Sequence, residues 1–358
     1  MRQYLPGLGN RLGMEEDCTM ARRVYPEFHK SLMEKEAWPS ATRRVKFEET
    51  HVSYLYRTGE FLYKIRKNSA LYDNLPIKER YIQLSLQLGK IWAPEMTHAV
   101  LPVVRTPAGF SVGGAGEVVD YALQMTQLTG TYWLNHLAGK KIGPVAVGRL
   151  ARFIADCQAA RGNEGIGGEY ARVDYFRALV EETAYQARKY VGQTLSETML
   201  DVIHLPMNRF YEEARKLFQR RHKRGRVVHG HGNLTPEHIY MKGSSIAAFA
   251  PLDALGKFRE IDAAYDVAAL TNGLKLQGAG DINELLVKRY ITAAKDRDLP
   301  KVLPAFQVLN ALRMGQVFSE WLVETPEEQE ETRKEYREKA SAYYGLAVQA
   351  SKEIPREI

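Results

Sequence analysis

The order of extended and helical segments constrains the fold of this chain more than any single motif does. Residues 46–126 contain short extended segments rich in β-branched and aromatic residues, interrupted by one helical pattern from Pro76 to Trp92. From Thr131 onward nearly every segment has helical spacing, except for a β-rich stretch at Val227–Asp253. This order predicts an α+β fold with two lobes, a small α/β N-lobe and a large, mostly helical C-lobe.

The boundaries of these parts follow from local patterns. An apolar stripe at helical spacing predicts an N-terminal helical extension over residues 1–45, and its members are Met20, Val24, Phe28, Leu32 and Met33. The N-lobe is then expected over residues 46–126 and the C-lobe over residues 127–358. Strands are expected in the N-lobe at 50–56, 61–65, 99–105, 109–112 and 118–125. Helices are expected in the C-lobe near 145–160, 170–191, 196–220, 262–273, 282–296, 301–323 and 327–350.

Composition excludes several classes of protein. Of 358 residues, 45% are apolar and 26% are charged, which is ordinary for a globular chain. No apolar run reaches the roughly 18 residues of a membrane helix, and the N-terminus lacks the apolar core of a secretory signal, so a cytoplasmic protein without a membrane partner is expected. Two cysteines cannot form a disulfide framework. The net charge of +7 favours anionic partners such as nucleotides, phosphorylated small molecules or nucleic acid.

One stretch carries most of the functional information. It begins at Val227 and reads Val-Val-His-Gly-His-Gly-Asn-Leu-Thr-Pro-Glu-His-Ile. An apolar strand pattern then ends at Asp253, and Asp262 and Asp266 follow, separated by three residues. This region, 227–266, resembles the catalytic region of the aminoglycoside phosphotransferase-like kinases, whose pattern is His-Gly-Asp-Leu-x-Pro-x-Asn-Ile, then a strand ending in Asp, then Asp-x-x-x-Asp. The Pro-Glu-His-Ile version is similar to a bacterial subfamily that is often fused to a P-loop ATPase domain.

The N-lobe resembles the same subfamily in several segments that occur in the same order. They are Glu49–Ser53, Thr58–Glu60, Tyr63–Lys67, Gly113–Tyr121 and Met125–Leu128. The resemblance covers about residues 46 to 320, and it implies a protein-kinase-like fold that binds ATP and Mg²⁺. The sequence contains no Gly-x-x-x-x-Gly-Lys-Ser/Thr motif, so an ATPase half is not expected in this chain.

The resemblance also implies which residues bind the nucleotide. Lys64 matches the strand lysine that holds the ATP phosphates, and Lys67 is the alternative if the hairpin register is shifted. The backbone from Met125 to Leu128 matches the segment that binds adenine, although a plain linker would carry the same pattern. A glutamate on the helix that begins at Pro76 should pair with the lysine. The sequence predicts Leu84, Ser85 and Leu88 as the inward positions of that helix, with Glu79 well upstream, so no glutamate is expected at the position that would pair with the lysine.

Three further positions are expected to serve the metal ion and the loop. Asp253 matches the chief magnesium ligand, with an aspartate that caps the next turn as the alternative. His238 stands where the wider superfamily has its second metal ligand, an asparagine, and imidazole is a poor ligand for Mg²⁺. Asp266 matches an aspartate that ties the catalytic loop to a helix, which is a structural role.

Asn233 departs from the family pattern at the catalytic position. It replaces the aspartate that accepts the hydroxyl proton, and an amide has no usable basicity. General-base catalysis typically contributes about 10²–10⁴-fold, so phosphotransfer is expected to be impaired. His231 could act as an unusual base, but the matching histidine packs inside the loop and the structural role is favoured. Zinc binding by His229, His231 and His238 would need further ligands that this stretch does not clearly supply.

A basic run, Arg220–Arg226, precedes the loop. Such a run can bind phosphates or nucleic acid, but a solvated helix C-terminus is the favoured interpretation because cations stabilise that end of a helix. We therefore favour a kinase-like ATP-binding protein with impaired or atypical phosphotransfer, a pseudokinase, whose partner beyond the nucleotide is an unknown small molecule or protein. One alternative is an active small-molecule phosphotransferase with an unusual base. The other is a nucleic-acid-binding protein on a kinase-like scaffold.

Overall fold

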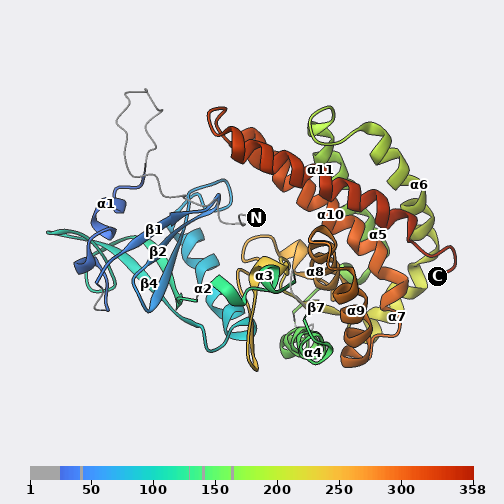
Figure 1. Cartoon of the computed structure of the whole chain (residues 1–358), viewed down its shortest axis with the longest axis horizontal. Coiled ribbons are helices and arrows are strands. Elements are labelled where there is room, and N and C mark those ends of the chain that lie inside the picture. Colours follow the sequence, from blue (N-terminus) through green and yellow to red (C-terminus); the bar gives the residue numbers. More distant parts are fainter. Residues whose placement is uncertain (1–24, 41–42, 129, 139–141, 163–164) are drawn as a thin grey trace. The chain divides into compact units, whose positions relative to one another are not determined.

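The computed structural model describes residues 25–40, 43–128, 130–138, 142–162 and 165–358. The chain divides into two compact units, Met1–Thr129 and Gly130–Ile358 (Figure 1). Met20 and Val24, two members of the predicted N-terminal helix, lie outside the described residues. No helix in the described ranges is long and apolar enough to cross a membrane.

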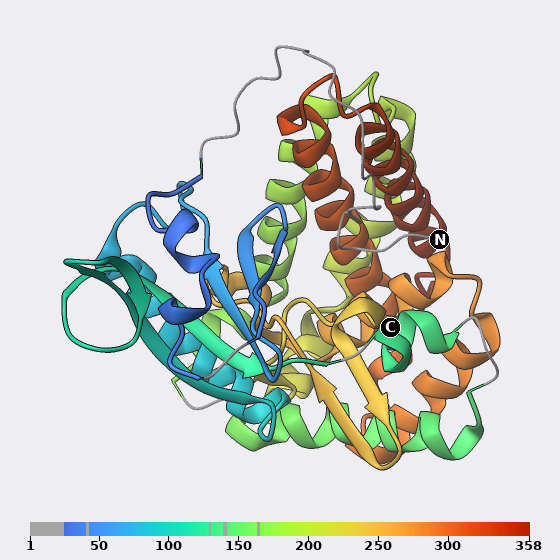
Figure 2. The ribbon, with the colours of Figure 1, turned by 60° about the vertical axis from the view of Figure 1, so that its left-hand side comes forward.

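The first unit is built on a six-stranded antiparallel sheet with the strand order β1-β2-β3-β6-β4-β5 (Figure 2). Its strands are β1 (Lys46–Glu49), β2 (Ser53–Arg57), β3 (Phe61–Arg66), β4 (Thr97–Thr106), β5 (Gly109–Val112) and β6 (Glu117–Thr126). The helix α2 (Leu75–Trp92) packs against β4 and β6. All of the predicted N-lobe strands are present, because alternating burial over two-residue periods is a reliable signal for a half-covered sheet.

Helix α2 buries two of the three positions that the sequence predicts to point inward. Its first turn is capped by Asn74, whose side chain accepts the Ile77 N–H at 3.0 Å. The fully buried residues of the helix are Lys78, Ile82, Ser85, Leu88, Gly89 and Trp92. A Cβ at Gly89 would lie 2.6 Å from Thr97, so the sheet approaches the helix over its small residues. The predicted inward positions Ser85 and Leu88 are buried, as expected. The third predicted position, Leu84, is only half-buried.

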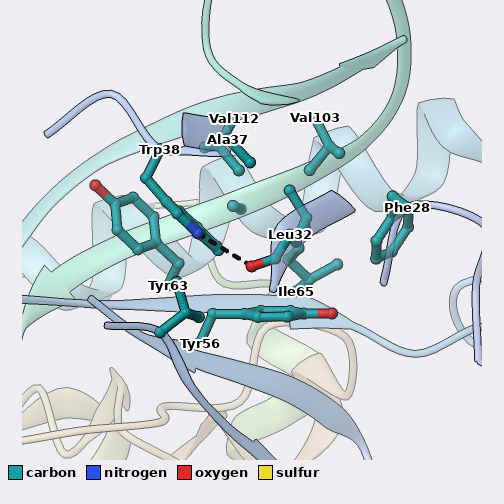
Figure 3. Close-up of a cluster of buried hydrophobic side chains, with 11 residues drawn as sticks. Phe28, Leu32, Ala37, Trp38, Tyr56, Tyr63, Ile65, Val103 and Val112 are labelled. Atoms are coloured by element: carbon teal, nitrogen blue, oxygen red, sulfur yellow. Dashed lines mark hydrogen bonds between the residues drawn. The ribbon is translucent and has the colours of Figure 1, made fainter. Parts of the chain in front are cut away.

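The segment from Tyr25 to Ser40 belongs to the core of the first unit. It contains only two short helices, α1 (His29–Leu32) and the 3-10 turn η1 (Lys35–Ala37), because Glu34 between them adopts extended backbone angles. The prediction of a continuous helix through Leu32 and Met33 is therefore wrong in the described part. Trp38 donates its Nε1–H to the Leu32 carbonyl at 3.1 Å (Figure 3). The side chains packed together here are Phe28, Leu32, Ala37, Trp38, Val45, Tyr56, Tyr63, Ile65, Val103, Val112 and Ala122.

The second unit is mostly helical, as the sequence predicts. Its helices are α3 (Leu134–Ala138), α4 (Pro144–Arg161), α5 (Val173–Ala187), α6 (Glu197–Glu213), α7 (Arg215–Lys223), α8 (Ala264–Leu276), α9 (Gly280–Ala294), α10 (Leu299–Glu324) and α11 (Glu330–Lys352). The predicted helix 196–220 is split at Ala214 into α6 and α7. Helix α10 is buried over most of its length and packs along α11 (Figure 1).

Four short strands interrupt the helices of the second unit. They are β7 (Val227–His229), β8 (Ile239–Lys242), β9 (Ser245–Ala248) and β10 (Glu260–Asp262). Strand β7 pairs with β10, and β8 and β9 form a hairpin (yellow in Figure 2). The apolar segment before Asp253 is thus a shorter strand than predicted, since β9 ends at Ala248. The α+β fold class is confirmed.

Candidate functional site

Lys64 lies at the centre of β3 with an apolar neighbour on each side. It is directly opposite Leu55 of β2 and Leu123 of β6 in the strand register. Its chain neighbours Tyr63 and Ile65 point to the other sheet face, where both are fully buried. Lys64 itself is half-buried, so one face of the sheet presents an ammonium group flanked by two leucines.

Lys67, the alternative phosphate ligand, lies beyond the end of β3. Its Nζ is 2.5 Å from Glu49 Oε1 and 5.3 Å from the centre of the Tyr54 ring. The hairpin register agrees with the one in which Lys64 is the central strand lysine. Lys67 is held by a carboxylate of its own sheet, and Lys64 remains the better candidate for phosphate binding.

The buried ion pair of the first unit joins α2 to β6, and sequence reasoning missed it. Lys78 Nζ lies 2.5 Å from Asp120 Oδ2, and both side chains are almost fully buried. Lys78 also donates to the Arg66 carbonyl at 3.2 Å. Burial raises the pKa of Asp120, and the nearby Lys78 opposes that rise. The helix therefore contributes a lysine to a buried ion pair, whereas Glu79 is exposed.

The segment predicted to bind adenine follows β6. Met125 is buried in the strand. The Thr126 N–H donates to the Met96 carbonyl at 2.8 Å, and the Gln127 N–H donates to the Glu60 carbonyl at 2.9 Å. These two amides are occupied within the first unit, so Leu128 is the predicted residue whose N–H makes no hydrogen bond to another described backbone group.

In the second unit, Asp266 holds the loop that follows β7. Its Oδ2 accepts the His231 N–H at 2.9 Å, and its Oδ1 accepts the Gly232 N–H at 2.8 Å. Gln158 of α4 also donates to Oδ2, at 3.0 Å. A Cβ at Gly230 would lie 2.5 Å from this carboxylate, so the loop needs glycine there. The predicted structural role of Asp266, which ties the loop to a helix, agrees with these contacts.

His231 lies inside this loop. Its side chain is fully buried, and its Nδ1 accepts the Asn233 N–H at 3.3 Å. Burial holds the pKa of His231 well below its usual value, and the nearby His238 acts in the same direction. A neutral, enclosed imidazole supports the loop from within, and this position favours the structural role over that of a base that contacts substrate.

Asn233 and His238 contact each other at the end of the loop. His238 belongs to the 3-10 turn η5 (Pro236–His238), and its Nδ1 is 2.9 Å from the Asn233 carbonyl and 3.0 Å from Thr235 Oγ1. The Asn233 side-chain nitrogen is 3.4 Å from the same ring atom. A carbonyl oxygen can only accept a hydrogen bond, so the contact with the Asn233 carbonyl requires a proton on Nδ1.

Asp253 lies on a segment that runs beside the loop. The Phe249 N–H donates to the His238 carbonyl at 2.8 Å, and the Leu252 N–H donates to the His231 carbonyl at 2.9 Å. Asp253 follows directly, is buried, and accepts the Ala254 N–H at 2.9 Å. This last bond is the turn contact of the alternative interpretation. The pairing nevertheless places Asp253 alongside the loop that carries the other predicted site residues.

The donor atoms available for a metal ion are few. No group of three or more histidine, cysteine, aspartate or glutamate side chains in the described ranges could hold a metal ion, so the zinc interpretation has no support. The predicted pair consists of the Asp253 carboxylate, which suits Mg²⁺, and the His238 imidazole, which does not. Of the two predicted ligands, only Asp253 offers the oxygen donors that Mg²⁺ prefers.

The basic run is an ion-pair network. Arg221 is 1% exposed and contacts Asp262 and Asp296 through four N–O distances of 2.7–2.8 Å. Arg220 and Arg224 both pair with Asp298, at 2.9 and 2.8 Å. Hydrogen bonding from Arg220 holds the pKa of Asp298 below its usual value. The run ends a helix, as predicted, and Lys223 and Arg224 are exposed, but aspartates distant in the sequence pair with three of its arginines.

Comparisons of sequence alone identify no relative: no protein-family model matches this chain, and no curated protein matches it. Its structure does match solved structures. Aminoglycoside 2'-phosphotransferase-IIIa in a GDP complex aligns over 90% of this chain and 99% of its own, with a TM-score of 0.56 and 14% identity. The GDP and kanamycin complex of APH(2")-IIia covers 89% of this chain and 99% of its own, with a TM-score of 0.53 and 13% identity.

A choline/ethanolamine kinase family protein from Mesorhizobium loti is also similar, over 90% of this chain and 98% of its own, with a TM-score of 0.52 and 11% identity. This chain has the aminoglycoside phosphotransferase-like fold. Lys64 lies on the third strand of the first unit, and Asn233 lies in the loop after β7 of the second unit. At this identity the likeness concerns the fold, and the chemistry has to be argued from the site.

Proposed function

We propose that this protein binds a nucleoside triphosphate with a divalent metal ion and transfers phosphate slowly or not at all. Lys64 would hold the phosphates, the backbone at Leu128 would contact the base, and Asp253 would hold the metal. The observation that supports the proposal is the loop after β7, whose backbone at His231 and Gly232 is held by Asp266; the resemblance puts the catalytic base of the family at Asn233, which is an amide.

The argument depends on how little covalent chemistry phosphoryl transfer requires of a protein. The site must position the nucleotide, neutralise phosphate charge and orient the acceptor hydroxyl. A bound metal ion supplies charge neutralisation on the phosphate oxygens. Among the residues of this chain, Lys64 offers a positive charge on a sheet face where Leu55 and Leu123 lie opposite it. The charge suits a phosphate group, and the apolar surface suits a flat nucleobase. Asn233 can orient a hydroxyl by hydrogen bonding, but it cannot remove its proton.

The residues named above suit both adenine and guanine nucleotides. The proposed contacts at Leu128 are made by backbone groups, which ATP and GTP can both use. Two of the similar structures are described as GDP complexes, so guanine nucleotides belong in the test beside the ATP expected from the sequence.

A second candidate function is an active phosphotransferase for a small hydroxyl-bearing molecule. Its support is that the similar proteins are named as an aminoglycoside phosphotransferase and a choline/ethanolamine kinase family protein, and that the likeness covers nearly all of their chains. Nucleic-acid binding loses its main support, since the arginines at 220, 221 and 224 are paired with aspartates.

Thermal unfolding of the purified chain with ATP or GTP and a divalent metal ion tests the proposal. We expect a nucleotide-dependent rise in melting temperature that is lost in Lys64→Met and retained in Lys67→Met. The second variant is a matched control, because Lys67 is held by Glu49. The proposal is wrong if no nucleotide raises the melting temperature of the native chain, or if Lys67→Met, and not Lys64→Met, abolishes the rise.

A further inference from the structure

Three arginines are buried in the described part of the second unit. Arg221, Arg259 and Arg313 are 1, 4 and 6% exposed. Arg221 pairs with two buried aspartates, and Arg259 Nη2 lies 2.5 Å from Glu260 Oε1. Arg313 makes no ion pair with any described residue, and its hydrogen bonds go to neutral groups. Because a buried charge is costly unless it is paired, Arg313 is the one buried arginine of this part whose charge is not compensated.

Arg313 extends from α10 to the loop after β7. Its Nη1 donates to the Gly232 carbonyl at 3.1 Å and to the Tyr265 hydroxyl of α8 at 3.1 Å. The guanidinium carbon lies 4.5 Å from the centre of the Phe258 ring. These contacts fix one nitrogen and one face of the guanidinium, but none of them supplies a formal negative charge. They hold a cation against the residue that precedes Asn233.

The other two side-chain nitrogens of Arg313 are available to a ligand. Nε and Nη2 make no hydrogen bond to a described residue, and neither belongs to the fully enclosed polar atoms of these residues that lack a partner. The Nε of Arg259 does belong to that enclosed group. The edge of Arg313 that carries Nε and Nη2 therefore reaches solvent. Two parallel N–H groups on one edge match the paired oxygens of a carboxylate or a phosphate.

From this uncompensated cation we propose that Arg313 binds an oxyanion, the phosphate or carboxylate group of a small molecule that lies at the loop after β7. The oxyanion supplies the negative charge that the described residues do not supply. The inference rests on the proposed function in one respect: since Asn233 is the next residue of the loop, the molecule is the phosphate acceptor. The acceptor is then an anionic molecule, because a polycation would meet an unpaired positive charge there.

Isothermal titration of the full native chain with inorganic phosphate, and in parallel with malonate, tests the proposal at constant ionic strength. We expect at least one of the two probes to bind. Arg313→Lys keeps the charge but loses the paired N–H groups, so it should weaken that binding by about tenfold or more. Arg313→Gln keeps a donor for the Gly232 carbonyl without the charge and should abolish the binding. Arg152→Lys, at an exposed arginine of α4, is the matched control and should change nothing.

The affinities are measured below the melting temperature of each variant, so a loss of stability alone cannot imitate a loss of binding. The inference is overturned if neither probe binds the native chain. It is overturned as well by an unchanged affinity in both Arg313 variants, or by an equal loss in Arg152→Lys, which would show adventitious binding.

A repeat of the titration with saturating ATP and a divalent metal ion separates the inference from the proposed function. Retention of probe binding assigns the oxyanion to a second ligand, as proposed. Displacement of the probe by ATP overturns that assignment, because Arg313 would then contact a phosphate of the nucleotide itself. Probe binding that depends on Arg313, in a chain that binds neither ATP nor GTP, supports the oxyanion site and rejects the proposed function.

Discussion

Replacing Arg221 by methionine should destabilise the second unit far more than any other change in the basic run. Arg221 is 1% exposed, and its guanidinium satisfies two buried carboxylates, Asp262 and Asp296. Methionine fills a similar volume but leaves both carboxylates buried without their cation. Breaking a buried ion pair by removing one partner costs about 3–5 kcal/mol. Because two carboxylates are left at once, we expect a loss at the upper end of that range.

The neighbouring arginine provides the control. Arg220 is 39% exposed at its side chain and pairs with Asp298, so Arg220→Gln should cost about 1 kcal/mol or less. Urea unfolding followed by far-ultraviolet circular dichroism measures both variants. The triple variant Arg221→Met, Asp262→Asn, Asp296→Asn removes the uncompensated charges and should recover part of the loss.

The reasoning fails if Arg221→Met costs less than about 1 kcal/mol, or if Arg220→Gln costs as much. It also fails if the triple variant is no more stable than Arg221→Met alone, because the loss would then come from packing and not from charge. A nucleic-acid binding test should therefore leave the buried Arg221 in place and neutralise Arg220, Lys223 and Arg224.

Three further predictions concern other parts of the molecule. Asn233→Asp should raise single-turnover phosphate transfer, by up to the roughly 10²–10⁴-fold of general-base catalysis, and a fall in turnover would point to another base. Ala250→Gly should stabilise the chain by about 0.5–1 kcal/mol in urea unfolding, because glycine adopts a positive φ without strain; Ala254→Gly, outside that conformation, should destabilise it instead. Trp38→Ala should destabilise the first unit by about 3–5 kcal/mol, whereas Met33→Ala at an exposed position should have little effect, and equal losses would show that residues 25–40 are not part of the core.

Most strands and helices could be predicted because apolar residues recur in the sequence with the period of a strand or of a helix. Strands with alternating burial and long amphipathic helices produce patterns that survive without knowledge of the tertiary contacts. The failures occur where tertiary contacts decide the local structure. The extended backbone of Glu34 ends α1 after four residues, and Gly89 faces the sheet because it is small enough for close packing. Neither fact has a signal in apolar spacing.

The candidate site divides in the same way. The positions of Lys64, Asn233 and Asp253 in their elements follow from motifs, because each motif is a short segment with its own turn chemistry. The buried ion pairs of Lys78 and Arg221 do not, since a charged residue in a sequence is by default a surface residue. Asp120 lies 42 residues from Lys78, and the nearer partner of Arg221, Asp262, lies 41 residues away. Only the folded chain shows that these charges are paired.

The contact between positions 233 and 238 makes a final prediction about catalysis. With aspartate at 233, the new carboxylate would stand where the amide nitrogen now lies, 3.4 Å from His238 Nδ1. A carboxylate that accepts the Nδ1–H is stabilised in its charged form and is a weaker base, so Asn233→Asp alone should recover only part of the available rate. Adding His238→Asn removes the imidazole N–H that faces position 233 and offers an amide oxygen where the resemblance expects a metal ligand. We therefore expect the rate of phosphate transfer in a single-turnover assay with Mg²⁺ to rise, in the double variant, by more than the product of the factors measured for the two single variants. A rise equal to that product would show that the two positions act independently.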